Sequence, residues 1–236
     1  MVTEITRLED VRPGDLYLGP IGGWVGVGVS AGELLVDGGF RVGKLDVRHI
    51  GVVVEATTTE GSSDEWPTGV IHAPRLAQAM PGGAEIVDMT YDRHWSPKCA
   101  YARLPEDYPG QAEDAVAIAR LMVEHSVAYS PASYPALAAW HWGIATPRLE
   151  KWIGRRQAEP SELVLPSGKG IAGPKGLLPV EAICSVFADQ AWSLTGKKIF
   201  DDGRPHQCVT PSQLGQRLLF GLEDVIWGWP SGHPYP

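Results

Sequence analysis

The spacing of the apolar residues changes near residue 110, and this change limits the folds open to the chain. Before that point, short runs rich in Val, Ile and Leu alternate with stretches rich in Gly, Pro and Asp. This pattern is typical of short strands joined by turns. Beyond it, apolar residues at 115, 118, 119, 122 and 123 follow helical spacing. The two halves together predict an α+β fold in which a mostly antiparallel sheet packs against helices.

The individual elements follow from the same patterns. We treat residues 1–236 as one domain with an insertion at about 131–178 and an irregular tail at about 222–236. The glycine-rich stretch 21–47 suits hairpins, and Thr210 followed by Pro211 is typical of a helix start. One short predicted strand ends near residue 19, and further strands cover 47–56, 69–73, 84–89 and 99–104. The predicted helices cover 110–126, 180–195 and 211–220.

Charge and cysteine content exclude several functional classes. The chain has 28 Asp plus Glu against 20 Lys plus Arg, a net charge of −8, and no basic run, which argues against binding nucleic acid or anionic lipid by bulk charge. The three cysteines, Cys99, Cys184 and Cys208, are too few and too scattered for a disulfide framework or a cysteine-rich zinc site. We therefore expect no metal and no cofactor.

One cysteine and two distant histidines form the strongest candidate for chemistry. Cys184 lies in the first turns of a predicted helix, where the helix dipole favours the reactive thiolate, so we expect a lowered thiol pKa. His49 and His72 lie in predicted strands, and pairing of these strands would bring the histidines together. A thiol, an imidazole and a group that orients the imidazole are the requirements of a cysteine hydrolase. The alternative is a buried structural cysteine with structural histidines.

Three sequence motifs resemble a known family. The stretches Pro13–Leu16, His49–Val53 and Val70–Ala73 are similar to those of the NlpC-type papain-like cysteine peptidases. The cysteine follows these strands here, which resembles the circularly permuted branch of the YiiX-like hydrolases and, more distantly, the lecithin:retinol acyltransferases. In that branch a Cys-Ser pair opens the last core helix, as Cys184-Ser185 does here. The resemblance extends from Arg12 to about Leu214 and implies a permuted papain-like fold.

The resemblance also implies roles for individual residues. It implies that Cys184 is the nucleophile, His49 the base and His72 the group that orients it, with the Cys184 sulfur within about 4 Å of the His49 ring. Glu55 is an alternative third residue if the strand pairing shifts. Tyr129 matches a tyrosine that assists the oxyanion site, although a core or surface aromatic is the alternative.

The insertion carries a further expectation. Trp140 and Trp142 flank His141, and long connections in compact domains are often functional. We expect this segment to cover the cleft above Cys184 and to bind substrate, with simple packing of the tryptophans as the alternative.

The resemblance implies that the substrate is a cell-wall peptide, cleaved as an amide through an acyl-enzyme. A lipid amide or ester hydrolase, or an acyltransferase, is the alternative, although no membrane span or basic amphipathic stretch is visible. The N-terminus has no apolar signal-peptide core, so we expect synthesis in the cytosol and delivery by a phage particle or a lysis system. A structural or binding module, such as a phage tail component that binds other phage proteins, is the third possibility.

Overall fold

The computed structural model describes about two thirds of the chain in detail. The described residues are 5, 10–21, 23–36, 39, 41–42, 45–56, 58–60, 70–72, 74–89, 99–105, 111–130, 133–143, 163–168, 170–171, 178–179, 181–196, 199–204, 208–222 and 225–228.

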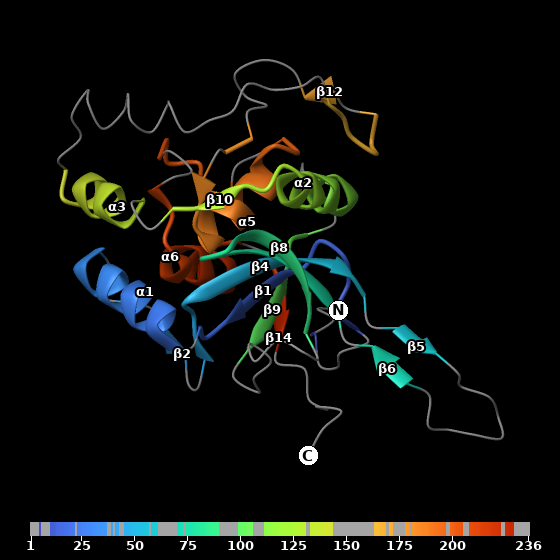
Figure 1. Ribbon diagram of the computed structural model, residues 1–236, viewed down its shortest axis with the longest axis horizontal. Helices are drawn as coiled ribbons and strands as arrows, with labels where there is room; N and C mark the ends of the chain where they lie inside the picture. The colour runs from blue at the N-terminus through green and yellow to red at the C-terminus, as the bar shows by residue number, and fades with distance from the viewer. Residues whose placement is uncertain are drawn as a thin grey trace.

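An antiparallel sheet of six strands forms the centre of the molecule, with α2 and α5 packed on one side of it (Figure 1). This arrangement confirms the α+β class. The strand order is β14-β9-β1-β4-β7-β8. The strands are β1 (Leu16–Gly19), β4 (His49–Glu55), β7 (Arg75–Met80), β8 (Gly83–Asp88), β9 (Ala100–Arg103) and β14 (Ile226–Gly228).

Strand β14 corrects the prediction of an irregular tail. Trp227 pairs with Ala102 in β9, so part of the tail extends the sheet at its edge. The sequence shows little of this, because three residues offer too short a pattern to reveal a strand. The backbone pairing partner on β9 determines it instead.

The two faces of the sheet support two separate apolar cores. Along the central strand β4, Ile50 and Val52 belong to the main core, which includes Val186 and Phe187 of α5. Val53 points to the opposite face and packs with Tyr17 and other residues of a second, smaller core. Both faces of β4 are therefore covered, which explains its continuous apolar run in place of an alternating one.

Four short strand pairs accompany the main sheet. Three are antiparallel, and the parallel pair β10–β13 joins the end of α2 to the start of α5. The pairs are β2 (Arg41–Val42) with β3 (Leu45–Asp46), β5 (Thr58–Glu60) with β6 (Val70–His72), β11 (Leu163–Val164) with β12 (Gly170–Ile171), and β10 (Ala128–Tyr129) with β13 (Glu181–Ala182).

The helices agree with the predictions except at the N-terminal end of the chain. The predicted helices near 110–126 and 211–220 are confirmed, and the one predicted over 180–195 begins later, at Cys184. The helices are α1 (Gly23–Val36), α2 (Ala112–Glu124), α3 (Ser133–His141), α5 (Cys184–Ser193) and α6 (Pro211–Gln216), the last continued by the π-helix η3 (Arg217–Gly221).

Helix α1 overturns the prediction of hairpins across residues 21–47. Among the described residues of that stretch, the only hairpin is the short β2–β3 pair, and α1 takes up about half of the stretch. Helix α1 lies beside α3 (Figure 1), and a Cβ atom added at Gly32 would lie only 2.7 Å from Tyr134 Cδ1. Glycine is unfavourable inside an isolated helix, and tertiary packing supplies most helical stability in proteins. Close packing on α3 therefore outweighs the low helix propensity of this segment.

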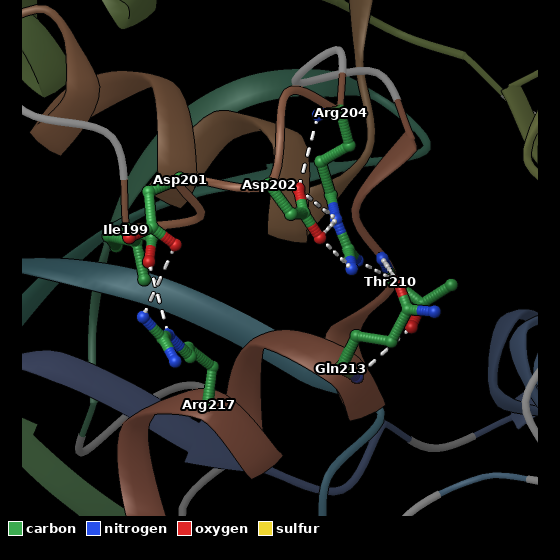
Figure 2. A network of polar contacts seen from close by, with 7 residues as sticks. All are labelled: Ile199, Asp201, Asp202, Arg204, Thr210, Gln213 and Arg217. Atoms are coloured by element: carbon green, nitrogen blue, oxygen red, sulfur yellow. Dashed lines mark hydrogen bonds and ion pairs between the residues drawn. The ribbon is translucent and has the colours of Figure 1, made fainter. Parts of the chain in front are cut away.

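A polar network anchors the segment between α5 and α6 (Figure 2). Arg204 Nη1 donates to Gln213 Oε1 at 2.9 Å, and the Gln213 backbone N–H donates to Thr210 Oγ1 at 3.0 Å. The latter bond belongs to a capping box, which confirms Thr210 as the N-cap of α6. Arg217 Nε donates to the Ile199 carbonyl at 3.3 Å. The network ties this segment to the start of α6, which lies close to Cys184.

No helix among the described residues is both long enough and apolar enough to cross a membrane.

Candidate active site

Cys184 is the first residue of α5, and its sulfur lies against the backbone of β4. Strand β13 ends two residues earlier and fixes the entry into the helix. The thiol donates to the Arg48 carbonyl, with Sγ and O separated by 3.9 Å, and the Ile50 N–H is directed at the sulfur. These two backbone groups lie on either side of His49. The fold therefore brings Cys184 to the strand position of the predicted base.

His49 opens β4 and is completely buried. Its Nε2 atom is hydrogen-bonded to Gln78 Oε1 at 2.7 Å, across the boundary between β4 and β7. The Tyr17 ring lies edge-on to the imidazole, with 6.2 Å between the ring centroids. The imidazole is therefore held in one orientation by an amide on one strand and an aromatic ring on another.

The thiol and the imidazole approach the same point of β4 from different directions. His49 shares a sheet face with Tyr17 and Gln78, whereas α5 packs on the face of Ile50. Among the described residues, no hydrogen bond joins the Cys184 thiol to the imidazole. The predicted contact between the thiol and the imidazole is therefore absent from this structure, because His49 lies on the sheet face opposite the one on which α5 packs.

The predicted lowering of the Cys184 thiol pKa is wrong for this structure. Burial raises the pKa to about 12, and the nearby Glu33 carboxylate acts in the same direction. The N–H groups of Ile50, Ser185 and Cys184 itself lower it, but by less. Cys184 is only 1% exposed, and the loss of hydration destabilises a thiolate more than the start of a helix stabilises it. In the resting protein the thiol is protonated.

We therefore predict that Cys184 reacts slowly with iodoacetamide at neutral pH. The alkylation rate should rise about tenfold per pH unit up to about pH 10, because the thiolate is the nucleophile and its pKa lies near 12. Mass spectrometry of the labelled peptide measures the rate for each cysteine separately. A plateau between about pH 6 and 8 would instead indicate a thiolate stabilised by an imidazolium, and would contradict a protonated resting thiol.

His72 does not take the predicted position beside His49. Its strand β6 pairs with β5, opposite Thr58, in a hairpin outside the main sheet, and its side chain lies outside the described residues. Strand β7 occupies the place next to β4, with Ala77 paired to Val52. Gln78 contacts the ring instead.

Glu55, the alternative third residue of the site, pairs with two arginines and not with His49. It lies at the far end of β4 from His49 and accepts hydrogen bonds from Arg120 at 2.9 Å and Arg75 at 3.0 Å. The hydrogen bond from Arg120 is the largest influence that lowers the Glu55 pKa. Glu55 thus belongs to a surface ion pair rather than to the imidazole.

Tyr129 lies near the start of α5 and interacts electrostatically with Cys184, and its role at the oxyanion site stays a prediction. Pairing of β10 with β13 sets Tyr129 opposite Ala182, two residues before the thiol. Burial raises the Tyr129 pKa to about 12, and the Cys184 charge adds to the effect. The long insertion between these residues made the match weak in sequence, but a parallel pair of two-residue strands brings them together. The phenol is therefore a protonated group near the sulfur.

Two further side chains near the thiol were not predicted. Tyr134 on α3 is partly buried, and its electrostatic interactions with Cys184 and Tyr129 reinforce the effect of burial in raising its pKa. Glu33 on α1 is 3% exposed, and its Oε1 accepts the Ser212 N–H at 3.1 Å. Neither residue belongs to a motif, and α1 itself was not predicted, so no sequence signal pointed to them. Both residues interact electrostatically with Cys184.

The insertion contributes Tyr134, near its beginning, to the surroundings of Cys184. Tyr134, at the start of α3, lies near Cys184, whereas Trp142 beyond the end of α3 is 57% exposed. The Trp140 side chain and residues 144–162 lie outside the described residues. A substrate-binding role for Trp140 and Trp142 stays a prediction.

The other two cysteines are buried free thiols. Burial raises the Cys208 pKa to about 12, and Cys99 lies in the second core. Cys184 is distinguished from them by its position against the backbone that carries His49.

Comparison with protein-family models, with curated proteins and with solved structures finds no match to this chain.

Proposed function

We propose that the chain is a cysteine hydrolase that cleaves an amide bond through Cys184, with His49 as base and Gln78 as the residue that orients the base. The observation that carries the proposal is the position of the Cys184 sulfur against the two backbone groups that flank His49, whose ring is held by an amide. A thiol at a helix start, an imidazole and an amide that orients the imidazole are the groups that thiol hydrolases use. The antiparallel sheet and the position of the cysteine after the histidine strand agree with a permuted papain-like fold.

The chemistry follows from these groups. Cys184 Sγ attacks the substrate carbonyl carbon while its proton passes to His49, and His49 then protonates the departing amine as the C–N bond breaks. Water, deprotonated by His49, attacks the resulting thioester, and the thiol takes back its proton as the C–S bond breaks. In this mechanism the Cys184 and Ser185 N–H groups at the helix start, with the Tyr129 hydroxyl, would donate to the oxyanion.

The resting state has to open before it can react. The thiol is protonated and buried, and it does not contact the imidazole. Catalysis would require a rearrangement around β4 that brings the ring and the thiol together, since catalytic hydrogen bonds often form only in the substrate complex. This requirement makes the proposed enzyme inactive when closed.

The proposed substrate is a cell-wall peptide, on the strength of the NlpC-type motifs. A phage particle or lysis system is the proposed setting, and a lipid amide or ester is the alternative substrate. A second candidate function is a structural or binding module that has kept the fold without catalysis. The burial of Cys184 and its thiol pKa of about 12 favour that candidate.

Digestion of purified cell wall distinguishes these functions. We expect the wild-type protein to clear a wall zymogram and to release peptides with new amino termini, detected by mass spectrometry. Cys184→Ala should abolish this activity, whereas Cys208→Ala, a matched change at another buried thiol of pKa about 12, should retain it.

Three outcomes would contradict the proposal. Equal digestion by Cys184→Ala would exclude this nucleophile. Hydrolysis of an N-acyl lipid amide without digestion of the wall would show that the substrate is a lipid and not a cell-wall peptide. If the folded wild-type protein leaves both substrates intact and forms no acyl adduct with an activated ester, the binding-module function stands instead.

A further inference from the structure

We infer that Glu85 is a positioning residue that acts through Gln78 to determine which nitrogen of His49 carries the proton. The arrangement of the three side chains stands on its own geometry. Its importance for catalysis rests on the proposed function.

The three side chains form a row across three neighbouring strands. Strand β7 pairs with β4 on one side and with β8 on the other. Gln78 lies directly opposite Glu85 in the β7–β8 register, so the two side chains project from the same face of the sheet. On the other side, Gln78 reaches diagonally to His49. The row therefore runs from a buried imidazole, through a buried amide, to a carboxylate at the exposed edge strand.

The hydrogen bonds along this row have only one consistent direction. A carboxylate accepts hydrogen bonds and cannot donate them, so the Gln78 amide group must donate from Nε2 to Glu85 Oε1, at 3.1 Å. This orientation turns Gln78 Oε1 toward His49, at 2.7 Å from Nε2. An amide oxygen also only accepts, so His49 Nε2 must carry a hydrogen. The neutral ring then has its lone pair on Nδ1, the nitrogen left to act as base.

Gln78 alone could not impose this choice. An amide side chain can rotate by half a turn and present either its oxygen or its NH₂ group. With the NH₂ group toward the ring, Nε2 would have to accept the hydrogen bond and the proton would move to Nδ1. Nδ1 would then have no lone pair with which to act as a base. Glu85 prevents this rotation because an amide oxygen facing a carboxylate would have no hydrogen to share and would be repelled.

The nitrogen NMR spectrum of the imidazole tests the inference directly. In uniformly ¹⁵N-labelled protein, long-range ¹H–¹⁵N correlations distinguish a protonated ring nitrogen from a bare one. The His49 signals are assigned by their loss in His49→Gln. We expect neutral His49 to be the Nε2–H form in the wild type. Glu85→Gln, which can both donate and accept, should give a mixture with the Nδ1–H form.

Two variants serve as controls. Glu85→Asp keeps the accepting carboxylate and should restore the Nε2–H form at least in part. Asp88→Asn removes a carboxylate from the same strand on the other face and should leave the ring spectrum unchanged. An Nδ1–H ring in the wild type, or an unchanged ring in Glu85→Gln, would overturn the inference.

The readout does not depend on turnover, so it separates two kinds of failure. A protein that hydrolyses nothing but shows the Nε2–H ring and its loss in Glu85→Gln would contradict the proposed function and support the role of Glu85 on the ring. An active hydrolase whose His49 ring carries its proton on Nδ1 would support the proposed function and contradict the role of Glu85.

Discussion

Replacing Arg103 with methionine is expected to lower the free energy of unfolding by about 3–5 kcal/mol, because it leaves a buried carboxylate without its charged partner. The Asp15 side chain is 1% exposed and that of Arg103 is 15% exposed. Arg103 Nε donates to Asp15 Oδ1 at 2.8 Å, and Nη2 donates to Oδ2 at 2.7 Å. The pair joins β9 to the residue that precedes β1, so its loss affects the middle of the sheet.

Chemical denaturation at pH 7 measures this effect. Arg75→Met is the matched control, because Arg75 pairs with Glu55 where both side chains are at least 40% exposed, and such pairs contribute about 1 kcal/mol or less. The double variant Asp15→Asn with Arg103→Met should recover much of the loss, since no charge then stays buried. Equal losses for Arg103→Met and Arg75→Met would show that the buried pair has no special role.

The loss should also depend on pH in a definite direction. Burial is the largest influence on the Asp15 pKa and raises it, while the hydrogen bond and charge of Arg103 lower it. Without Arg103, the folded-state pKa rises further above the unfolded value. A carboxyl group with a raised folded-state pKa destabilises the protein as pH rises through that range. The deficit of Arg103→Met should therefore be smaller near about pH 4 than at pH 7.

His49→Gln is expected to lower kcat/KM for wall peptide by about 10²–10⁴-fold, the usual contribution of a general base. The proposed mechanism uses His49 both to accept the thiol proton and to return it to the leaving amine, so no other described group replaces it. Rates are compared for samples with the same folded fraction, measured by circular dichroism, because His49 is buried and its loss also affects stability.

His125→Gln provides the matched control for this prediction. His125 is exposed at the C-cap of α2, and its replacement should leave kcat/KM unchanged. Gln78→Ala should lower kcat/KM less than His49→Gln, because it loosens the ring without removing it. A His49→Gln enzyme with wild-type activity would remove His49 from the mechanism and direct attention to another base.

Local patterns in the sequence determined the secondary structure wherever a segment carries its own signal. Helical spacing predicted α2, the Thr210-Pro211 pair predicted the start of α6, and the apolar run from His49 predicted the central strand. These signals are local because they depend on helix and strand periods and on capping groups within a few residues. For the same reason, Cys184 could be placed near a helix start from its sequence context alone.

Only the tertiary structure decided which residues meet. Gln78 contacts His49 because β7 pairs with β4, whereas the strand that carries His72 pairs with β5 in a separate hairpin. The sequence has no local signal for such a choice, because strand partners depend on packing across many residues. Tyr129 reaches Cys184 for the same reason, through the pairing of β10 with β13.

The Cys184 thiol pKa likewise has one local contribution and one that depends on the tertiary structure. The helix start, a local feature, favours the Cys184 thiolate, and the sequence alone showed that influence. The larger influence is burial, which raises the pKa to about 12. Burial sums contributions from segments far apart in the chain, including the backbone around His49 that the sulfur contacts. The sequence by itself therefore determined the candidate nucleophile, and the tertiary structure determined its resting state.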